Sequence, residues 1–324
     1  MKKIIILPYF GEFNNYFPLW LNSVKENKTT DFLIITDNEW EWDFPSNIII
    51  FNWSFDRLKT EFTNKFNKKL KLDKPYKLCD FKPYYGFLFS DYIKDYDFWG
   101  YCDCDLIFGN IDRFLGKELF DKYDKILRTG HLSFIRNKRD INENFLSFDT
   151  YKTVIKSPAI YGYDESIFGF HDGFAGELIS NGYSFYRNDK LVADIDFRHY
   201  PFRVVSQPEP PCVFTYEEGN IFRIDKTKEG IKKTEMMYIH LQKRKMEIMF
   251  NCEMNKFIIR PNTFCPFSNE QLENNDFWDE VTRENCKYFN NRKEMIYDIK
   301  RDLTRFLYEP QKVKSIIYRF ANRR

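Results

Sequence analysis

The sequence predicts an α/β fold, a mixed sheet flanked by helices, followed by a helical C-terminal extension. Two observations predict it. Short apolar runs alternate with segments of helical periodicity over the first hundred residues, and the pattern becomes mainly helical from Asn269 onward. Strands that alternate with helices form βαβ units with parallel strands. With 324 residues and 43% hydrophobic content, the chain can bury a core of this kind.

The N-terminal elements follow from the spacing of apolar side chains. Three short apolar runs are expected to be strands: residues 3–7, 31–36 and 47–51. Apolar residues three or four positions apart predict two amphipathic helices, over residues 17–24 and 55–70. A further helix is expected to begin near Pro83 and to lead into the apolar run 98–108, which is expected to be a buried strand.

The pattern beyond residue 110 is less regular. Strands are expected at residues 126–135, with a turn inside, and at 236–240 and 257–261. No linker of low complexity and no internal repeat separates these elements. We therefore expect one domain over residues 1–265 and a helical extension over residues 266–324.

Two carboxylates, Asp103 and Asp105, stand one residue apart within the apolar run 98–108. Alternate residues of a strand share a face, and carboxylate oxygens suit Mg²⁺ or Mn²⁺. The same spacing recurs at Asp95-Tyr-Asp97 and Asp194-Ile-Asp196, so the apolar context distinguishes the first pair. Buried carboxylates are costly unless they are paired or bound to metal. A metal site is predicted, with a turn cap as the alternative.

Three expected strands have ends that could contact a ligand. These ends are Pro8-Tyr9, Thr36-Asp37 and the Asp103-Cys104-Asp105 segment. In open α/β sheets, ligands bind at the carboxyl ends of the strands. One crevice is therefore expected to collect all three.

The stretch from Lys77 to Ile111 resembles glycosyltransferases of the GT-A fold with a DXD motif, within a bacterial group similar to glycosyltransferase family 32. The resemblance rests on Lys77-Leu-Cys-Asp-Phe-Lys-Pro-Tyr-Tyr-Gly86 and Phe98-Trp-Gly-Tyr-Cys-Asp-Cys-Asp-Leu-Ile-Phe-Gly-Asn-Ile111, and more weakly on Tyr238-Ile-His-Leu-Gln-Lys-Arg244. The chain departs from family 32 at Trp99-Gly100-Tyr101, where the family has Gly-Gly-x-Tyr. A retaining and an inverting reaction both stay open.

The resemblance implies a set of donor-binding residues. Asp103, Asp105 and His240 would hold Mn²⁺ or Mg²⁺, Asp103 would also contact the donor, and Lys243 or Arg244 would meet its diphosphate. Asp80 and Lys82 would lie near the hydroxyls of the donor sugar. The nucleoside would be held by Pro8, Tyr9 and Asp37. A metal and a cation that neutralise a departing diphosphate accelerate its departure.

Carboxylates between residues 163 and 177 are candidates for the acceptor side. We expect Asp164 and Glu165, then Asp172, to be the catalytic carboxylates. In an inverting reaction one of them would remove the acceptor proton, and in a retaining reaction they would orient the acceptor or stabilise positive charge. Capping of turns in a Gly-rich loop is the alternative. His131 is a further candidate for lining the acceptor cleft.

Charge and cysteine content limit the partners. Lys and Arg number 50 against 48 Asp and Glu, so a nucleic-acid binder is not expected. Residues 301–324 contain seven basic and two acidic residues interleaved with apolar ones, which is typical of a basic amphipathic helix on an anionic membrane or of a helix packed on the protein body. Seven scattered cysteines and the lack of a signal-peptide pattern favour the cytoplasm, with peripheral contact at the inner membrane face.

The expected function is metal-dependent transfer of a sugar, a hexosyl transfer, from a nucleoside-diphosphate donor to a glycan or lipid-linked acceptor. A UDP-sugar is the expected donor, and bacterial surface polysaccharide synthesis is the expected setting. Two alternatives stay open. Asp194, Asp196 and His199 could serve a metal-dependent phosphoesterase. The chain could also be a sugar-binding protein without turnover.

Overall fold

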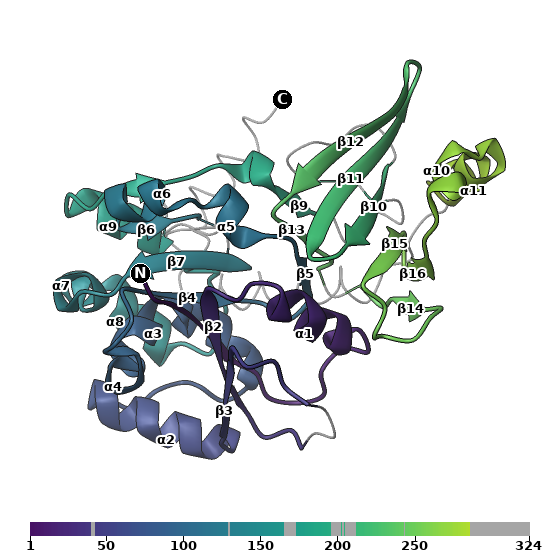
Figure 1. The fold of residues 1–324 in the computed structure, drawn as a ribbon. Helices are drawn as coiled ribbons and strands as arrows, with labels where there is room; N and C mark the ends of the chain where they lie inside the picture. Colours follow the sequence, from purple (N-terminus) through teal and green to yellow (C-terminus); the bar gives the residue numbers. More distant parts are fainter. Residues whose placement is uncertain are drawn as a thin grey trace, which may run out of the picture.

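The computed structural model describes residues 1–39, 43–128, 130–164, 173–195, 202, 204, 212–242 and 244–285. Within these residues the strands form sheets of seven, six and three strands, with helices packed around the largest (Figure 1). The expected α/β class with a mixed sheet flanked by helices is confirmed.

The seven-stranded sheet has the order β3-β2-β1-β4-β7-β6-β8. Its first four members are parallel, β7 runs antiparallel to β4 and β6, and β8 runs parallel to β6. The strands are β1 (Lys3–Pro8), β2 (Thr30–Thr36), β3 (Ile48–Asn52), β4 (Phe98–Cys102), β6 (Lys125–Ile126), β7 (Leu132–Arg136) and β8 (Phe185–Tyr186).

The strand order changes direction at β1. From β1 the chain proceeds outward through β2 to β3, and then returns to the opposite side of β1 as β4. At such a switch point the flanking connections separate and leave a crevice beyond the carboxyl ends of the strands. By this rule the crevice is expected where β1 ends at Pro8 and β4 ends at Cys102.

Helices cover both faces of this sheet, because both faces of its strands are apolar (Figure 1). In β1, Ile4 and Ile6 point to the face covered by α2, α3, α4 and α8, whereas Ile5 and Leu7 point to the face covered by α1, α5 and α6. The helices are α1 (Phe17–Lys25), α2 (Phe55–Phe66), α3 (Tyr85–Leu88), α4 (Ser90–Ile93), α5 (Ile111–Phe114), α6 (Lys117–Lys122), α7 (Arg139–Asn142), α8 (Thr150–Lys156) and α9 (Gly173–Ser180).

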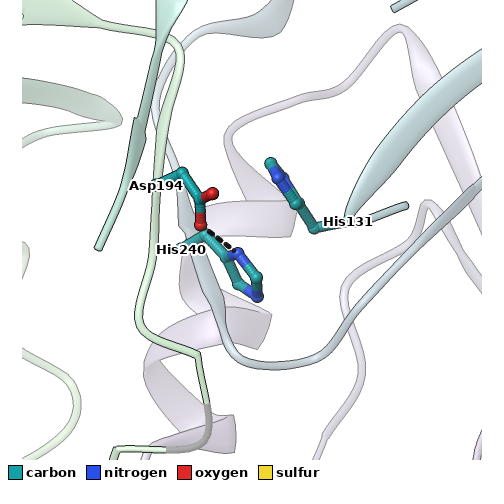
Figure 2. A group of neighbouring side chains, drawn as sticks. All are labelled: His131, Asp194 and His240. Carbon is teal, nitrogen blue, oxygen red and sulfur yellow. Dashed lines mark hydrogen bonds and ion pairs between the residues drawn. The ribbon is translucent and has the colours of Figure 1, made fainter. Parts of the chain in front are cut away.

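A three-stranded sheet of β5 (Leu106–Phe108), β13 (Tyr238–His240) and β9 (Val192–Asp194) lies beside the crevice. β13 is the central strand, antiparallel to β5 and parallel to β9. His240 pairs in register with Leu106 on one side and with Asp194 on the other. Segments that are distant in the sequence are thereby brought together (Figure 2).

The six-stranded sheet has the order β12-β11-β10-β15-β16-β14. Trp278 and Val281 of α11 pack against its side chains Val213 and Ile258. The elements are β10 (Cys212–Glu217), β11 (Asn220–Thr227), β12 (Gly230–Met236), β14 (Glu247–Ile248), β15 (Lys256–Arg260), β16 (Thr263–Pro266), α10 (Asn269–Glu273) and α11 (Asn275–Asn285).

The N-terminal strands and α1 agree with the sequence-based expectation, whereas the two following helices differ. The helix expected over residues 55–70 ends at Phe66, because Asn67 adopts a left-handed conformation with φ of 49° and caps it. The helix expected near Pro83 is a 3₁₀ helix, η1 (Pro75–Tyr84), followed by the short α3 and α4. Pro75 and Pro83 have no amide proton to donate, which limits a regular α-helix here.

The apolar run 98–108 is not one strand, and this expectation is wrong. β4 ends at Cys102 in the large sheet, β5 begins at Leu106 in the small one, and the two carboxylates lie in the connection. The Asp103 amide donates to His131 O at 3.2 Å, and the Leu241 amide donates to Asp105 O at 2.9 Å. Each end of the connection is therefore attached to a different sheet, so strand alternation does not explain why the carboxylates converge.

The two C-terminal helices α10 and α11 agree with the helical pattern expected from Asn269. Residues 286–324, including the basic segment, lie outside the described residues. None of the helices in the described part of the chain combines the length and the apolar character needed to cross a bilayer.

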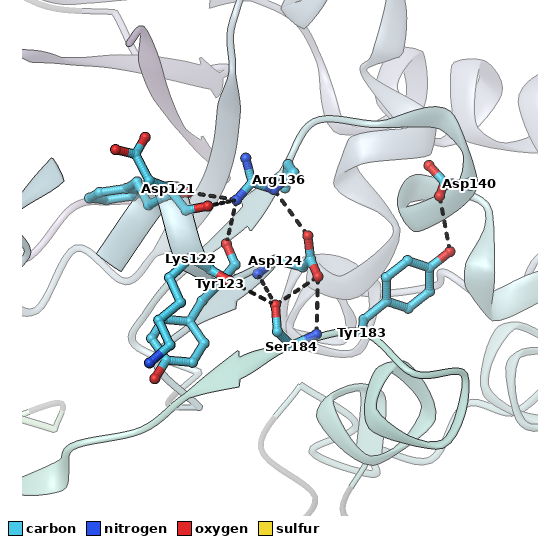
Figure 3. A network of polar contacts seen from close by, with 9 residues as sticks. Asp121, Lys122, Tyr123, Asp124, Arg136, Asp140, Tyr183 and Ser184 are labelled. Atoms are coloured by element: carbon cyan, nitrogen blue, oxygen red, sulfur yellow. Dashed lines mark hydrogen bonds and ion pairs between the residues drawn. The ribbon is translucent and has the colours of Figure 1, made fainter. Parts of the chain in front are cut away.

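A polar network fixes the far edge of the large sheet (Figure 3). Arg136 Nε donates to Asp124 Oδ1 at 3.0 Å, while the Ser184 amide and hydroxyl donate to Asp124 Oδ2 at 3.0 and 2.8 Å. Burial opposes the carboxylate, but these hydrogen bonds lower the pKa of Asp124 below its ordinary value. The network joins β6, β7 and the turn before β8 at this edge.

Lys125 of β6 is fully buried within the same sheet. Its ammonium nitrogen donates to Leu127 O at 2.8 Å and to Ser133 Oγ at 2.7 Å. Burial, only partly offset by the charge of Asp164, lowers the pKa of Lys125 to about 7. The folded protein therefore disfavours the charged form of this side chain.

We expect Lys125→Met to raise the free energy of unfolding at pH 7 by about 2 kcal/mol. The Leu127 carbonyl keeps the Ser133 hydroxyl as a donor at 2.8 Å. Unfolded lysine holds its proton to about pH 10.4, whereas folded Lys125 releases it near pH 7. Wild-type stability should therefore rise between these pH values, and the advantage of the variant should shrink. Urea unfolding at pH 7 and about pH 9.5 measures this.

The matched control is Lys117→Met, because Lys117 is an exposed lysine of α6. Its effect should be small and nearly the same at both pH values. A stability difference for Lys125→Met that does not change with pH would contradict the expectation.

Candidate active site

Asp103, Asp105 and His240 converge beside the crevice at the switch point. Their candidate ligand atoms all lie within 4.8 Å of one another, and His240 Nε2 is 3.3 Å from Asp105 Oδ1. Two carboxylates and an imidazole nitrogen are a donor set that fits a divalent cation, and the imidazole suits Mn²⁺ better than Mg²⁺. The residues therefore fit the metal that the sequence predicts.

The backbone holds these side chains in place. Asp105 directly precedes β5, and His240 ends β13, the strand paired with it. The Leu241 amide donates to Asp105 O at 2.9 Å, while the Asn14 side chain donates to Cys104 O at 3.1 Å. The connection that carries the carboxylates is thus tied to both neighbouring segments.

A third carboxylate, Asp194, holds the other side of His240 (Figure 2). His240 Nδ1 lies 2.8 Å from Asp194 Oδ1, and Gln242 Nε2 donates to the same oxygen. Burial opposes the charged imidazole, but Asp105 and Asp194 raise the pKa of His240 well above its ordinary value. Burial likewise opposes the Asp194 carboxylate, and the hydrogen bond from His240 lowers the pKa of Asp194 below its usual range.

His131 stacks on the ring of His240. The ring centroids are 4.3 Å apart with an interplanar angle of 26°, and the Tyr238 hydroxyl pairs with His131 Nδ1 at 2.7 Å. Burial, followed by the charge of His240, lowers the pKa of His131 to about 3. His131 is therefore a neutral platform beneath His240. Its expected place in an acceptor cleft stays a prediction.

Lys82 is a buried cation between two carboxylates. Its ammonium nitrogen donates to Asp103 Oδ1 at 2.6 Å and to Gly130 O at 2.8 Å, and lies 3.5 Å from Asp164 Oδ2. Burial opposes the charge, but Asp103 and Asp164 raise the pKa of Lys82 well above its ordinary value. Lys82 therefore stays charged and links the expected metal ligand Asp103 to the expected acceptor-side carboxylate Asp164.

Asp80 is fully buried. Its carboxylate accepts hydrogen bonds from Lys77 Nζ at 2.7 Å, from the Tyr161 amide at 2.9 Å and from the Tyr163 amide at 3.2 Å. Lys77 also donates to Ala159 O. Asp80 thus anchors the segment that carries Asp164, and these bonds occupy the oxygens expected to meet a donor sugar.

The residues expected to hold the nucleoside lie at the ends of β1 and β2. Pro8 is buried at the end of β1, and the Tyr9 ring stacks on Phe13 with centroids 4.5 Å apart. Burial and the nearby Cys104, Asp105 and Asp103 raise the pKa of Tyr9. Tyr9 therefore lies beside the carboxylate connection. The exposed Asp37 accepts from the Gly11 amide at 3.5 Å.

Of the residues expected to meet the diphosphate, Arg244 is described and Lys243 is not. Arg244 is buried, its guanidinium 5.2 Å from the Phe202 ring centroid and 3.2 Å from Asn262 Oδ1. Five expected site residues fall outside the described residues: Glu165, Asp172, Asp196, His199 and Lys243. Of the phosphoesterase alternative, only Asp194 is described, and it lies in the same cluster as Asp105 and His240.

Asp80→Asn leaves the Lys77 ammonium buried without its carboxylate, and we expect it to lower the free energy of unfolding by about 3 kcal/mol. In a Lys77→Met background the same change should cost at least about 1 kcal/mol less, because no unpaired charge remains. Urea unfolding of the four variants of this double-mutant cycle measures the coupling. Additive costs would show instead that Asp80 acts only through the backbone amides of Tyr161 and Tyr163.

Several solved structures resemble the chain. The galactosyltransferase LgtC, solved with donor and acceptor sugar analogs, is 12% identical with a TM-score of 0.36 over 59% of this chain and 75% of that one. The apo-form glycosyltransferase GlyE of Streptococcus pneumoniae TIGR4 is 12% identical with a TM-score of 0.34, over 59% and 46%. A glycosyltransferase involved in glycosylation of the major capsid of PBCV-1 is 8% identical with a TM-score of 0.30, over 60% and 85%.

Sequence comparison gives one family. No curated protein matches the chain significantly. The profile of DUF6625, described as a family of unknown function, matches residues 5–268. Because this match covers most of the chain, the protein belongs to the family DUF6625.

Proposed function

We propose that the protein is a metal-dependent glycosyltransferase of the GT-A fold that transfers a hexose from a nucleoside-diphosphate donor, a UDP-sugar, to a glycan or lipid-linked acceptor. The observation that carries the proposal is the convergence of Asp103, Asp105 and His240 at the switch-point crevice, next to the buried cation Lys82. In this proposal Asp103-Cys104-Asp105 is a DXD motif like that of the group similar to family 32. The proposed setting is bacterial surface polysaccharide synthesis.

Asp103, Asp105 and His240 would hold Mn²⁺ or Mg²⁺. A cation bound there supplies positive charge that offsets the charge of a departing nucleoside diphosphate. The residues contribute by fixing the donor set: each is partly or fully buried, and each has a backbone or side-chain partner. Lys243 and Arg244 stand three and four residues after His240 in the sequence, and we propose that one of them contacts the diphosphate.

Lys82 is proposed to orient the donor sugar. It stays charged, it is held by the Gly130 carbonyl, and it bridges Asp103 and Asp164. Sugar hydroxyls both donate and accept hydrogen bonds, so alternating carboxylates and an ammonium group match them. Asp80 is proposed to act without contacting the sugar, by holding the segment that carries Asp164.

The acceptor side is proposed to use Asp164, Glu165 and Asp172. A carboxylate there would remove the proton of the attacking hydroxyl in an inverting reaction, or orient the acceptor in a retaining one. Pro8, Tyr9 and Asp37 are proposed to hold the uracil and the ribose at the ends of β1 and β2, because ligands of open α/β sheets bind there.

Two further proposals concern the organisation of the chain. We propose that residues 1–265 form the transferase domain and that residues 266–324 form an extension. The basic segment 301–324 is proposed to contact an anionic membrane surface, which would suit a lipid-linked acceptor.

We expect UDP to bind the wild-type protein only weakly without Mn²⁺ and much more tightly with it. Asp105→Ala should remove this dependence, with a loss greater than the roughly 10- to 100-fold typical of outer-shell partners. Isothermal titration calorimetry with UDP and GDP, with and without Mn²⁺, measures this. Asp95→Ala is the matched control, because Asp95-Tyr-Asp97 has the same spacing and Asp95 is exposed.

Two results would contradict the proposal. Failure of both nucleotides to bind wild-type protein in the presence of Mn²⁺ would exclude the proposed donor site. Metal binding that survives Asp105→Ala and is abolished by Asp194→Ala would favour the phosphoesterase alternative.

We expect Lys82→Met to lower the rate of donor turnover by about 100- to 1,000-fold, because it removes the fixed positive charge that is proposed to lie beside the reacting sugar. Mn²⁺ binding should change by no more than a few-fold, since Lys82 is not a metal ligand in the proposal. UDP release from UDP-glucose and UDP-galactose, with Lys82→Arg as the charge-preserving control, measures the effect. Equal losses of metal binding and turnover would show that Lys82 acts by supporting Asp103.

A further inference from the structure

We propose that Asp194 is a positioning residue that fixes the imidazole of His240 with its Nε2 towards Asp105. This inference rests on the proposed function, because it concerns the site in which His240 would bind the metal. Asp194 itself is not assigned as a ligand. Its contribution is to decide which ring nitrogen carries the proton and which one faces the two carboxylates.

The two nitrogens of His240 meet different carboxylates. Nδ1 lies 2.8 Å from Asp194 Oδ1, and Nε2 lies 3.3 Å from Asp105 Oδ1. The hydrogen bond of one ring nitrogen sets the state of the other. A neutral ring whose Nδ1 proton is donated to Asp194 therefore presents the lone pair of Nε2 to the candidate metal position.

The sheet register makes this contact a fixed feature of the fold. His240 of β13 pairs with Asp194 of β9, and the Ile195 amide donates to His240 O at 3.0 Å. Asp194 is held in turn, because Gln242 Nε2 donates to the same carboxylate oxygen. Both partners of the contact are therefore residues of paired strands.

A second contact restrains the ring from its face. His131 stacks on His240 at a centroid distance of 4.3 Å and is itself paired with the Tyr238 hydroxyl at 2.7 Å (Figure 2). Asp194 acts within the plane of the ring, and His131 acts on its face. Together they oppose both rotation and flipping of the imidazole.

Direct ligation by Asp194 is the competing arrangement, since candidate ligand atoms of His131, Asp194 and His240 also lie within 4.8 Å of one another. Two contacts argue against it. Asp194 Oδ1 is already bonded to His240 Nδ1 and Gln242 Nε2. A ring nitrogen that donates its proton to a carboxylate has no lone pair for a metal. The placement of Nε2 towards Asp105 leaves that nitrogen as the ligand.

The test compares Asp194→Ala with Asp194→Asn in the full-length protein. Asn keeps an oxygen in place of Oδ1, and the Gln242 donor selects that oxygen over the amide nitrogen. We expect Asp194→Ala to weaken Mn²⁺ binding by about 10- to 100-fold, as for other outer-shell partners. Asp194→Asn should restore most of the affinity. Free Mn²⁺ measured by electron paramagnetic resonance gives both dissociation constants, with Asp149→Ala as an exposed carboxylate control.

A second readout does not need the metal. The chain has only 4 histidines, so ¹⁵N spectra of histidine-labelled protein are simple to assign. The spectra are recorded at a pH high enough for the His240 ring to be neutral. There we expect the proton on Nδ1 in the wild-type protein, and in Asp194→Ala a mixture of both tautomers. Asp194→Asn should retain the Nδ1 proton.

The outcomes separate the two proposals. An unchanged tautomer and unchanged Mn²⁺ affinity in Asp194→Ala would overturn the positioning role. Loss of Mn²⁺ binding in Asp194→Asn as complete as in His240→Ala would also overturn it, because it would make Asp194 a ligand. Wild-type protein that shows the Nδ1 tautomer and binds no Mn²⁺ would refute the proposed metal site and leave the positioning role intact.

Discussion

The pairing of β5 with β13 is the constraint on which the site depends. β5 starts immediately after Asp105, and β13 ends at His240, so the register that places His240 opposite Leu106 brings an imidazole beside two carboxylates. All residues of both strands are buried, from Leu106 to Phe108 in β5 and from Tyr238 to His240 in β13. A slip by one residue would turn each side chain to the opposite face. The hydrophobic core thus determines the geometry of the polar site.

Burying so many charges requires that each is compensated. Lys82 lies between Asp103 and Asp164, Lys77 pairs with Asp80, and His240 lies between Asp105 and Asp194. Removing one partner of such a pair lowers the free energy of unfolding by far more than the intact pair adds to it. The reason is that the remaining charge is left in a protein interior that solvates it poorly. The paired charges therefore specify an arrangement more than they add stability. Asp103 and Asp105 can directly follow the fully buried strand β4 because Lys82 and His240 compensate their charges.

Much of the fold could be predicted from the sequence, because β1 to β3 are short apolar runs and α1 shows a clear helical period. The site could be predicted only in part. The sequence predicts Asp103, Asp105 and His240 in one site, and their candidate ligand atoms lie within 4.8 Å of one another. The contact of His240 with Asp194 depends on the register between β13 and β9, which no local pattern reveals. The sequence predicts Asp80 near a ligand, whereas its buried carboxylate accepts from the backbone amides of Tyr161 and Tyr163, a contact that no sequence pattern marks.

The structure also changes how two competing interpretations of the sequence relate to each other. A DXD-type metal site and a carboxylate set around Asp194 looked like separate alternatives in the sequence, since the two segments lie far apart. In the fold they flank one imidazole, with Asp105 at Nε2 and Asp194 at Nδ1. A ring nitrogen that donates its proton to a carboxylate has no lone pair for a metal, so we infer different roles for the two carboxylates. In the proposed site, Nε2, which faces Asp105, would be the ligand atom, and Nδ1 would be held by Asp194.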